Sequence, residues 1–185
     1  MNKKHIFYIF SFLAALSVIF FLLGYFSLGQ KVYINQKYGF SLIYSFDWKE
    51  KDLAKSGLDN YLAFKIENEK YKAFFQVMVE EKKEKINISY DELAKRMNDS
   101  MPKELENFQK ISSRKILIDK KEALEYKYQY TYKTESGEKR ETKQVMVIFV
   151  NLNKIYYLTG QSPQSSFSHV EQEFNKIVKS FKINK

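Results

Sequence analysis

The chain has no cysteine among its 185 residues. Disulfide bonds, thiol nucleophiles, thiolate metal sites and a lipid-modified N-terminal cysteine are therefore excluded. Glycine and proline are scarce, at 6 and 2 residues. This scarcity predicts long regular elements joined by short turns, with no proline-rich linker.

Histidine is also rare, since only His5 and His169 are present. With no cysteine and no spaced acidic cluster, we expect neither a metal site nor a cofactor. Ser-His-Asp catalysis would need His169 as its base, and no Gly-x-Ser-x-Gly elbow presents a serine. A catalytic pair of carboxylates stays open as an alternative, because Asp and Glu are plentiful, but no spacing marks one pair. We therefore expect no catalytic residue.

Arginine is the scarce cation. The net charge is +9, and all but three of the 31 basic residues are lysines. Proteins that read nucleic acids depend on arginine for bidentate contacts, so no nucleic-acid partner is expected. A lysine-rich surface suits anionic lipid or an anionic envelope polymer. A composition shaped by an AT-rich genome is the alternative explanation.

Residues 6–28 form an apolar run that contains no Asp, Glu, Lys or Arg. As a helix this run extends about 35 Å, enough to cross a hydrocarbon core of about 30 Å. Lys3 and Lys4, in the short basic segment 1–5, predict a cytoplasmic N-terminus and an extracytoplasmic remainder at a bacterial cytoplasmic membrane. Secretion after cleavage near Gly29 is the alternative, but so long an apolar core favours a retained transmembrane anchor.

Residues 31–185 are expected to form one folded domain, because 17% of the chain is aromatic. Alternating patterns predict strands over 32–35, 40–44, 61–67, 71–80, 111–118, 123–134, 139–150 and 155–159. Ser89 and Glu92 have the spacing of a capping box that begins a helix, which Pro102 ends or interrupts. An apolar stripe predicts a last helix after Pro163. This order indicates an α+β fold, an antiparallel β-sheet flanked by helices.

Four tyrosines alternate along the predicted strand 123–134: Tyr126, Tyr128, Tyr130 and Tyr132. Period-two spacing places them on one face of the strand. The first interpretation is an aromatic face packed under a helix, with hydroxyls at the rim. The alternative is an exposed platform for a glycan, peptide or lipid partner. Trp48 is either a core residue or a rim contact, and these five residues are the candidate partner surface.

Two segments carry a family resemblance. Residues 38–48 combine a Gly-Phe strand, an aromatic residue and a tryptophan, while residues 155–182 join a strand ending in Thr-Gly to an apolar helix. Together they resemble the opening and closing segments of PsbP-like domains, over about residues 33–183. Ser45 stands where that family usually has proline. The resemblance implies an antiparallel sheet with helices on both faces, an α/β/α sandwich, and mostly accessory or binding roles. It transfers no functional residue.

These patterns predict a membrane-anchored extracytoplasmic accessory protein without catalytic activity. Its expected partners are the membrane and an envelope protein or anionic envelope polymer. The alternative is a carrier of a lipid or other apolar ligand between sheet and helix, and a third hypothesis is a hydrolase. An internal apolar cavity would favour the carrier, and convergent carboxylates or a base beside His169 would favour the enzyme. A solid core with exposed tyrosines would favour the binding protein.

Overall fold

A computed structural model describes residues 29–53, 61–134 and 136–184. Its strands are β1 (Gln30–Asn35), β2 (Phe40–Ser45), β3 (Lys49–Glu50), β4 (Leu62–Asn68), β5 (Ala73–Glu81), β6 (Glu106–Ile118), β7 (Lys121–Lys133), β8 (Lys139–Asn151), β9 (Lys154–Pro163) and β10 (Lys182–Ile183). The helices are α2 (Tyr90–Glu104), η2 (Gln164–Ser166), which is a 3₁₀ turn, and α3 (Phe167–Ser180).

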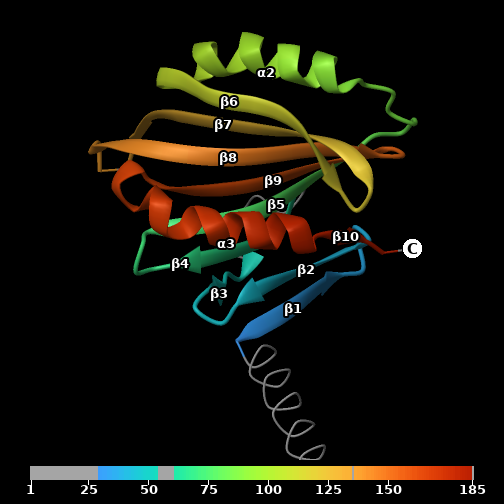
Figure 1. The fold of residues 1–185 in the computed structure, drawn as a ribbon, viewed down its shortest axis with the longest axis horizontal. Helices are drawn as coiled ribbons and strands as arrows, with labels where there is room; N and C mark the ends of the chain where they lie inside the picture. Colours follow the sequence, from blue (N-terminus) through green and yellow to red (C-terminus); the bar gives the residue numbers. More distant parts are fainter. Residues whose placement is uncertain (1–28, 54–60, 135, 185) are drawn as a thin grey trace, which may run out of the picture. The chain divides into compact units, whose positions relative to one another are not determined.

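The larger sheet has seven strands in the order β3-β4-β5-β9-β8-β7-β6, and its neighbouring strands pair antiparallel. A smaller sheet of three strands has the order β1-β2-β10. The ribbon in Figure 1 shows α3 lying across the larger sheet, whereas α2 lies at the β6 end. Antiparallel meanders with a helix on each side confirm the predicted α+β class.

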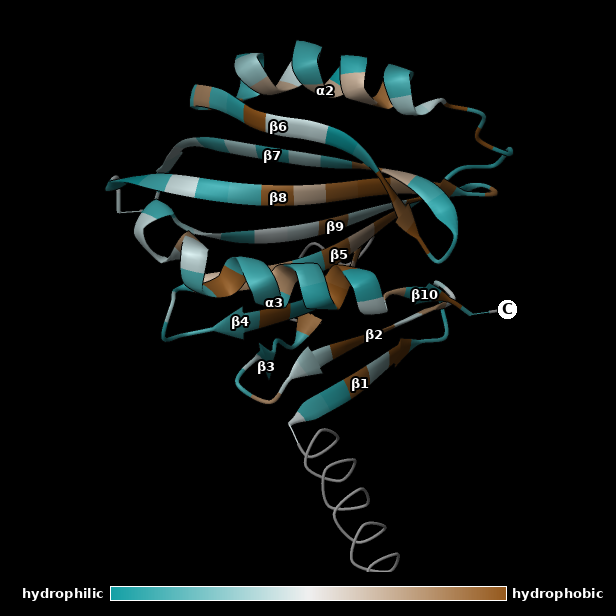
Figure 2. Cartoon of the chain, viewed as in Figure 1, coloured by the Kyte–Doolittle hydropathy of each residue, from teal (hydrophilic) through white to brown (hydrophobic). Residues whose placement is uncertain are grey.

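The first core lies between the larger sheet, α3 and the inner face of β2. The stripe of α3 supplies buried Val170, Phe174 and Ile177, and Figure 2 shows hydrophobic and hydrophilic residues alternating around this helix. The ring of Phe174 lies directly over Gly160 of β9, where a Cβ would be only 2.6 Å from the ring. Real Cβ atoms do not approach so closely, so β9 and α3 can pack at this distance because residue 160 is glycine.

The second core lies on the opposite face of the sheet, under α2. Apolar residues of α2, among them Met97 and Leu93, pack there against β7, β8 and β9. Successive side chains of a strand point to opposite faces, which lets β7 contribute to both cores. Both faces of the sheet are thus covered, as the family resemblance implied.

Ser89 caps the N-terminus of α2. Its backbone is extended and its Oγ accepts a hydrogen bond of 3.2 Å from the backbone N–H of Glu92. The Glu92 carboxylate instead pairs with Arg96 one turn later, at 2.7 Å, so only one half of the predicted capping box is confirmed. This ion pair between residues i and i+4 competes for the carboxylate that a full box would use.

Ser89→Ala is expected to lower the free energy of unfolding by about 1 kcal/mol, because an N–H of the first turn loses its acceptor. The sole tryptophan, Trp48, is buried, so urea unfolding can be followed by its fluorescence. Ser168→Ala, at an exposed position of α3, is the matched control and should cost nothing measurable. Equal effects of the two variants would contradict the capping role.

Some boundaries differ from the predicted ones. Pro102 lies inside α2, which continues to Glu104, since the missing N–H removes only one bond so near the end of the helix. Strand β6 starts five residues before the predicted 111, and the two-residue strands β3 and β10 were not predicted.

The predicted anchor, residues 6–28, lies outside the described residues. Among those that the structure describes, no helix is long and apolar enough to cross a membrane.

Candidate functional site

The tyrosine row of β7 faces α2. Tyr126, Tyr128 and Tyr130 are buried, while Tyr132 is 44% exposed. The hydroxyl of Tyr126 donates to Asn98 Oδ1 of α2 at 2.8 Å. The prediction of an aromatic face under a helix is therefore confirmed for three tyrosines. The alternative, an exposed platform, is wrong for these three, because α2 covers the face that carries them.

Trp48 is also buried and belongs to the first core. Its ring lies 5.7 Å from that of Phe174. The turn that carries it closes by a backbone hydrogen bond of 3.1 Å from Trp48 N–H to the carbonyl of Ser45, so the turn forms without the proline usual in the family. The rim-contact alternative for Trp48 is wrong, and Tyr132 is the one exposed residue of the candidate surface.

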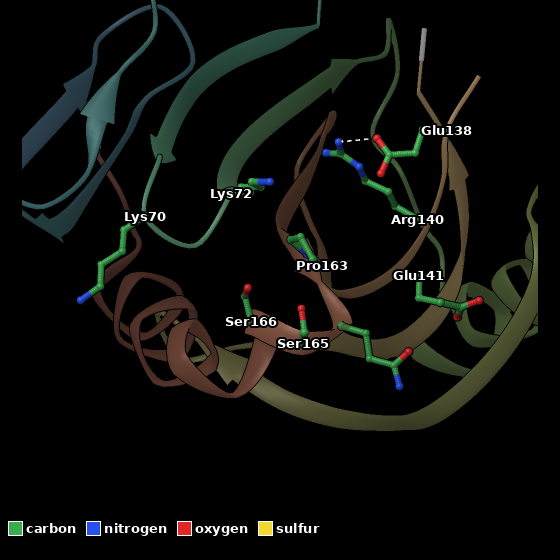
Figure 3. Close-up of a pocket in the computed structure, with 9 residues that line it drawn as sticks. Lys70, Lys72, Glu138, Arg140, Glu141, Pro163, Ser165 and Ser166 are labelled. Carbon is green, nitrogen blue, oxygen red and sulfur yellow. Dashed lines mark hydrogen bonds and ion pairs between the residues drawn. The ribbon is translucent and has the colours of Figure 1, made fainter. Parts of the chain in front are cut away.

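A hollow at one end of the seven-stranded sheet has a volume of about 660 Å³. We call it the sheet-end hollow. Its lining comes from the β4–β5 turn, the start of β8, the end of β9 and η2: Lys70, Lys72, Glu138, Arg140, Glu141, Pro163, Gln164, Ser165 and Ser166. Figure 3 shows Lys72, Pro163, Ser165 and Ser166 around this space, with Arg140 joined to Glu138.

Antiparallel pairing brings these segments together. Strand β9 pairs with both β5 and β8, so that Phe74 lies opposite Gln161 and Thr142 lies opposite Pro163. The turn before β5, the start of β8 and the end of β9 consequently meet at one end of the sheet. Lys72 has a φ of +50°, a conformation that side chains other than glycine adopt rarely and at a cost of about 1–2 kcal/mol.

The basic residues of the hollow differ in their partners. The Lys70 ammonium lies over the Tyr71 ring, 5.1 Å from its centroid. The Arg140 guanidinium lies 2.6 Å from the Glu138 carboxylate and lowers the pKa of Glu138, with a further contribution from the charge of Lys72. Arg140 is thus largely neutralised by its partner. Lys70 and Lys72 form no ion pair with the residues that the structure describes. The lining of the hollow therefore contains two lysines and the serines of η2, residue types whose side chains bind phosphate or carboxylate.

A second hollow, of about 310 Å³, adjoins the first through Lys72, Arg140 and Pro163. It contains the end of the tyrosine row, with Tyr130 and Tyr132 in its lining. The buried hydroxyl of Tyr130 donates to Gln161 Oε1 at 2.9 Å, which fixes this wall. The site as a whole joins three basic residues, the carboxylates of Glu138 and Glu141 and an aromatic rim. Its lysines can hold an anionic group, and the rim can pack against the chain that carries that group.

The geometry gives less support to catalysis by His169, to metal binding and to lipid binding. His169 is exposed on α3 and stacks on the ring of Tyr71, with centroids 5.3 Å apart. Across the described parts of the chain, no group of three or more His, Asp or Glu side chains could hold a metal ion. A hollow at the start of α2, between helix and sheet, has about 230 Å³. Pockets for small molecules usually start at about 300 Å³, so it is small for a lipid.

Of the residues that line the two hollows, only Tyr130 and Tyr132 belong to the candidate partner surface predicted from the sequence. Lys70 was expected in a turn, Lys72 in the strand 71–80 and Ser166 at the start of the last helix. The polar residues of each segment are visible in the sequence. No local pattern shows that these segments meet at one end of a sheet, because their meeting depends on which strands pair.

The fold and the site define a class of protein: an α+β sandwich whose sheet is covered by a helix on each face and has two adjoining hollows at one end. Within this class, the chain belongs to the PsbP family, because the family model described as PsbP matches residues 29–183. The resemblance noted in the sequence is confirmed.

Solved structures of similar fold come from several organisms. Cyanobacterial PsbP (CyanoP) from Synechocystis sp. PCC 6803 has a TM-score of 0.62 and 15% identity, covering 84% of this chain and 92% of its own. LpqN of Mycobacterium tuberculosis, described as involved in cell envelope biogenesis, has a TM-score of 0.53 and 12% identity, covering 84% and 91%. The Ran-binding protein Mog1p of Saccharomyces cerevisiae has a TM-score of 0.52 and 8% identity, covering 83% and 95%. These likenesses concern the fold alone. A search of curated protein sequences finds no match.

Proposed function

We propose that this protein is a membrane-anchored extracytoplasmic accessory protein, without catalytic activity, that binds an anionic polymer of the cell envelope through the sheet-end hollow. The observation that carries the proposal is that Lys70 and Lys72, which form no ion pair with the described residues, line the same hollow as Ser165 and Ser166. Such a set binds phosphate or carboxylate groups by charge-assisted hydrogen bonds. The open, polar lining suits one segment of a long chain better than an enclosed small molecule.

Three further observations support this reading over its rivals. The excess of lysine gives the chain a net charge of +9, which attracts polyanions over a distance of about 10 Å. Exposed Tyr132 provides an aromatic rim. The two helix–sheet interfaces are packed with buried side chains, where a carrier of apolar ligands would need a cavity. The CyanoP and LpqN structures add only that this fold occurs in bacterial proteins.

The test uses the full-length chain in detergent micelles and poly(glycerol phosphate) as the probe. Replacing both lysines, as Lys70→Ala with Lys72→Gly, should weaken binding about tenfold or more, because each charge-assisted hydrogen bond contributes about 1.5–3 kcal/mol. Glycine is chosen at position 72 because the positive φ there favours it. The free energy of unfolding should therefore stay unchanged or rise slightly while binding falls.

The matched control is Lys95→Ala with Lys103→Ala. Both lysines are exposed on α2, away from the hollow, and the double change removes the same charge. Equal weakening by the two pairs would show a general charge effect and would contradict a site. If instead the probe does not bind and crosslinking of Tyr132 variants to envelope extract yields one protein, the partner is a protein and the polymer proposal fails.

Anchoring by residues 6–28 is tested separately. The chain should stay with membranes after extraction with sodium carbonate, and protease should reach the domain only from the outer side of intact spheroplasts. Release by carbonate would contradict the anchor, and protection in spheroplasts would contradict the outer location.

A further inference from the structure

The outward face of the smaller sheet carries exposed apolar residues. Val32 and Ile34 of β1 are 66% and 61% exposed, and Ile43 of β2 is 36% exposed. On the inward face Tyr33 packs against Phe64 instead, with centroids 4.3 Å apart. Side chains alternate between the two faces of a strand, so Val32, Ile34 and Ile43 share the outward face. We call these three residues the β1–β2 patch.

The patch is a cluster of exposed apolar side chains, whereas the other exposed apolar residues are dispersed. The remaining exposed large apolar residues among those described lie on other segments: Phe46, Tyr61, Ile111, Leu117, Tyr132 and Leu152. Single exposed apolar residues are normal on a protein surface, but a group on one face points to an interaction site. All three members are β-branched, which suits a strand and leaves their methyl groups toward the outside.

The chain that precedes the patch indicates what covers it. The apolar run ends at Leu28, and only Gly29, Gln30 and Lys31 separate it from Val32. Four residue steps reach at most about 14 Å when fully extended. The polar interface of a bilayer is itself about 5–8 Å deep on each side of the hydrocarbon core. If residues 6–28 cross the membrane, the patch is held within reach of that interface by covalent connection.

The charge of the smaller sheet also favours the membrane interface as the surface that covers the patch. The three strands of the smaller sheet contain no Asp or Glu. Lys182 of β10 is exposed and lies opposite Ser41 of β2. Because Phe40 and Leu42 on either side of Ser41 are buried, Ser41 and its partner Lys182 face outward with the patch. Lysine beside apolar side chains is the composition of surfaces that rest on anionic lipid.

We infer that the β1–β2 patch docks on the membrane interface, with Val32, Ile34 and Ile43 among the lipid headgroups and acyl-chain ends. This inference rests on the proposed anchor but adds a second contact with the membrane. Docking fixes the orientation of the domain relative to the bilayer, whereas a tether alone leaves it free to rotate. The three strands bring no unpaired carboxylate to the lipid surface.

The test uses the full-length chain in vesicles of phosphatidylcholine and phosphatidylglycerol. Because the chain has no cysteine, a single Ile43→Cys can carry an environment-sensitive dye without background. Leu117→Cys, at an exposed apolar position of β6, is the matched control. Docking predicts a blue-shifted emission at position 43, quenched by lipids that carry a nitroxide in the headgroup, and neither effect at position 117.

A longer tether distinguishes docking of the patch from proximity to the membrane that the short link to residues 6–28 would impose. Inserting about 20 Gly/Ser residues between Leu28 and Gly29 lets the domain move about 25 Å away. Docking predicts that quenching at position 43 persists in this form, and that Val32→Thr with Ile34→Thr abolishes it. Threonine keeps the β-branched shape, and Trp48 fluorescence checks that these variants stay folded.

Three outcomes overturn the inference. They are equal quenching at positions 43 and 117, loss of quenching on lengthening the tether, or persistence of quenching in the double threonine variant. Each of these, in a chain that resists carbonate extraction, leaves the proposed anchor intact. Release of the chain by carbonate instead shows that the anchor itself fails, and the docking inference fails with it.

Discussion

Phe174→Ala is expected to lower the free energy of unfolding by about 3–5 kcal/mol, the usual cost of truncating a fully buried aromatic residue. Phe174 is 0% exposed. Its ring centroid lies 5.7 Å from that of Trp48, 6.1 Å from Phe167 and 6.2 Å from Phe75. The cost combines lost burial with a cavity that rigid neighbours cannot close. Urea unfolding followed by Trp48 fluorescence measures it, and Phe46→Ala, at a half-exposed position, should cost far less.

A double-mutant cycle with Gly160 tests the contact itself. Gly160→Ala alone should destabilise the domain by about 1–3 kcal/mol, because the new methyl group meets a ring that has no room to move. In the Phe174→Ala background the same change should cost little or even stabilise, since the methyl group then enters the cavity. A coupling of about 0.5–3 kcal/mol is expected. If Gly160→Ala cost the same in both backgrounds, the close approach of β9 and α3 would be refuted.

The domain is expected to unfold cooperatively as the pH rises from about 10 toward 12. Burial raises the pKa of Tyr130, Tyr156 and Tyr157 to about 12, with added repulsion from Tyr132, Glu81 and Glu80 respectively, whereas an unfolded tyrosine ionises near pH 10. Protonated tyrosines therefore favour the folded state. Their stabilisation is complete below the unfolded pKa and is lost as the pH rises through the folded pKa.

Tyrosinate absorbance and Trp48 fluorescence, recorded together, measure this transition. Both signals should change at the same pH, because the buried hydroxyls ionise when the core opens. Tyr157→Phe should move the midpoint upward, since it removes one buried ionisable group, and Tyr61→Phe, at an exposed position, should leave it unchanged. Tyrosines that ionise while Trp48 remains buried would contradict the argument.

The elements of the fold were predictable where the pattern is local. The β4 and β5 strands, the start of α2 at Ser89 and the stripe of α3 follow from period-two and helical spacing, which depend only on neighbouring residues. The pattern failed at Pro102 and at the two-residue strands β3 and β10. A proline near a helix end costs one hydrogen bond, and a two-residue strand exists only because a partner strand lies beside it.

The sequence by itself determined the α+β class, the order of the elements, the family and the absence of cysteine chemistry, because these depend on composition and on spacing along the chain. Tertiary structure alone decided that Tyr126, Tyr128, Tyr130 and Trp48 are core residues while Tyr132 is exposed. It also decided that the segments carrying Lys70, Arg140 and Ser166 line one hollow. Strand alternation assigns a residue to a face of the sheet, but whether a helix covers that face, and which turns meet at its end, depends on pairing between distant strands.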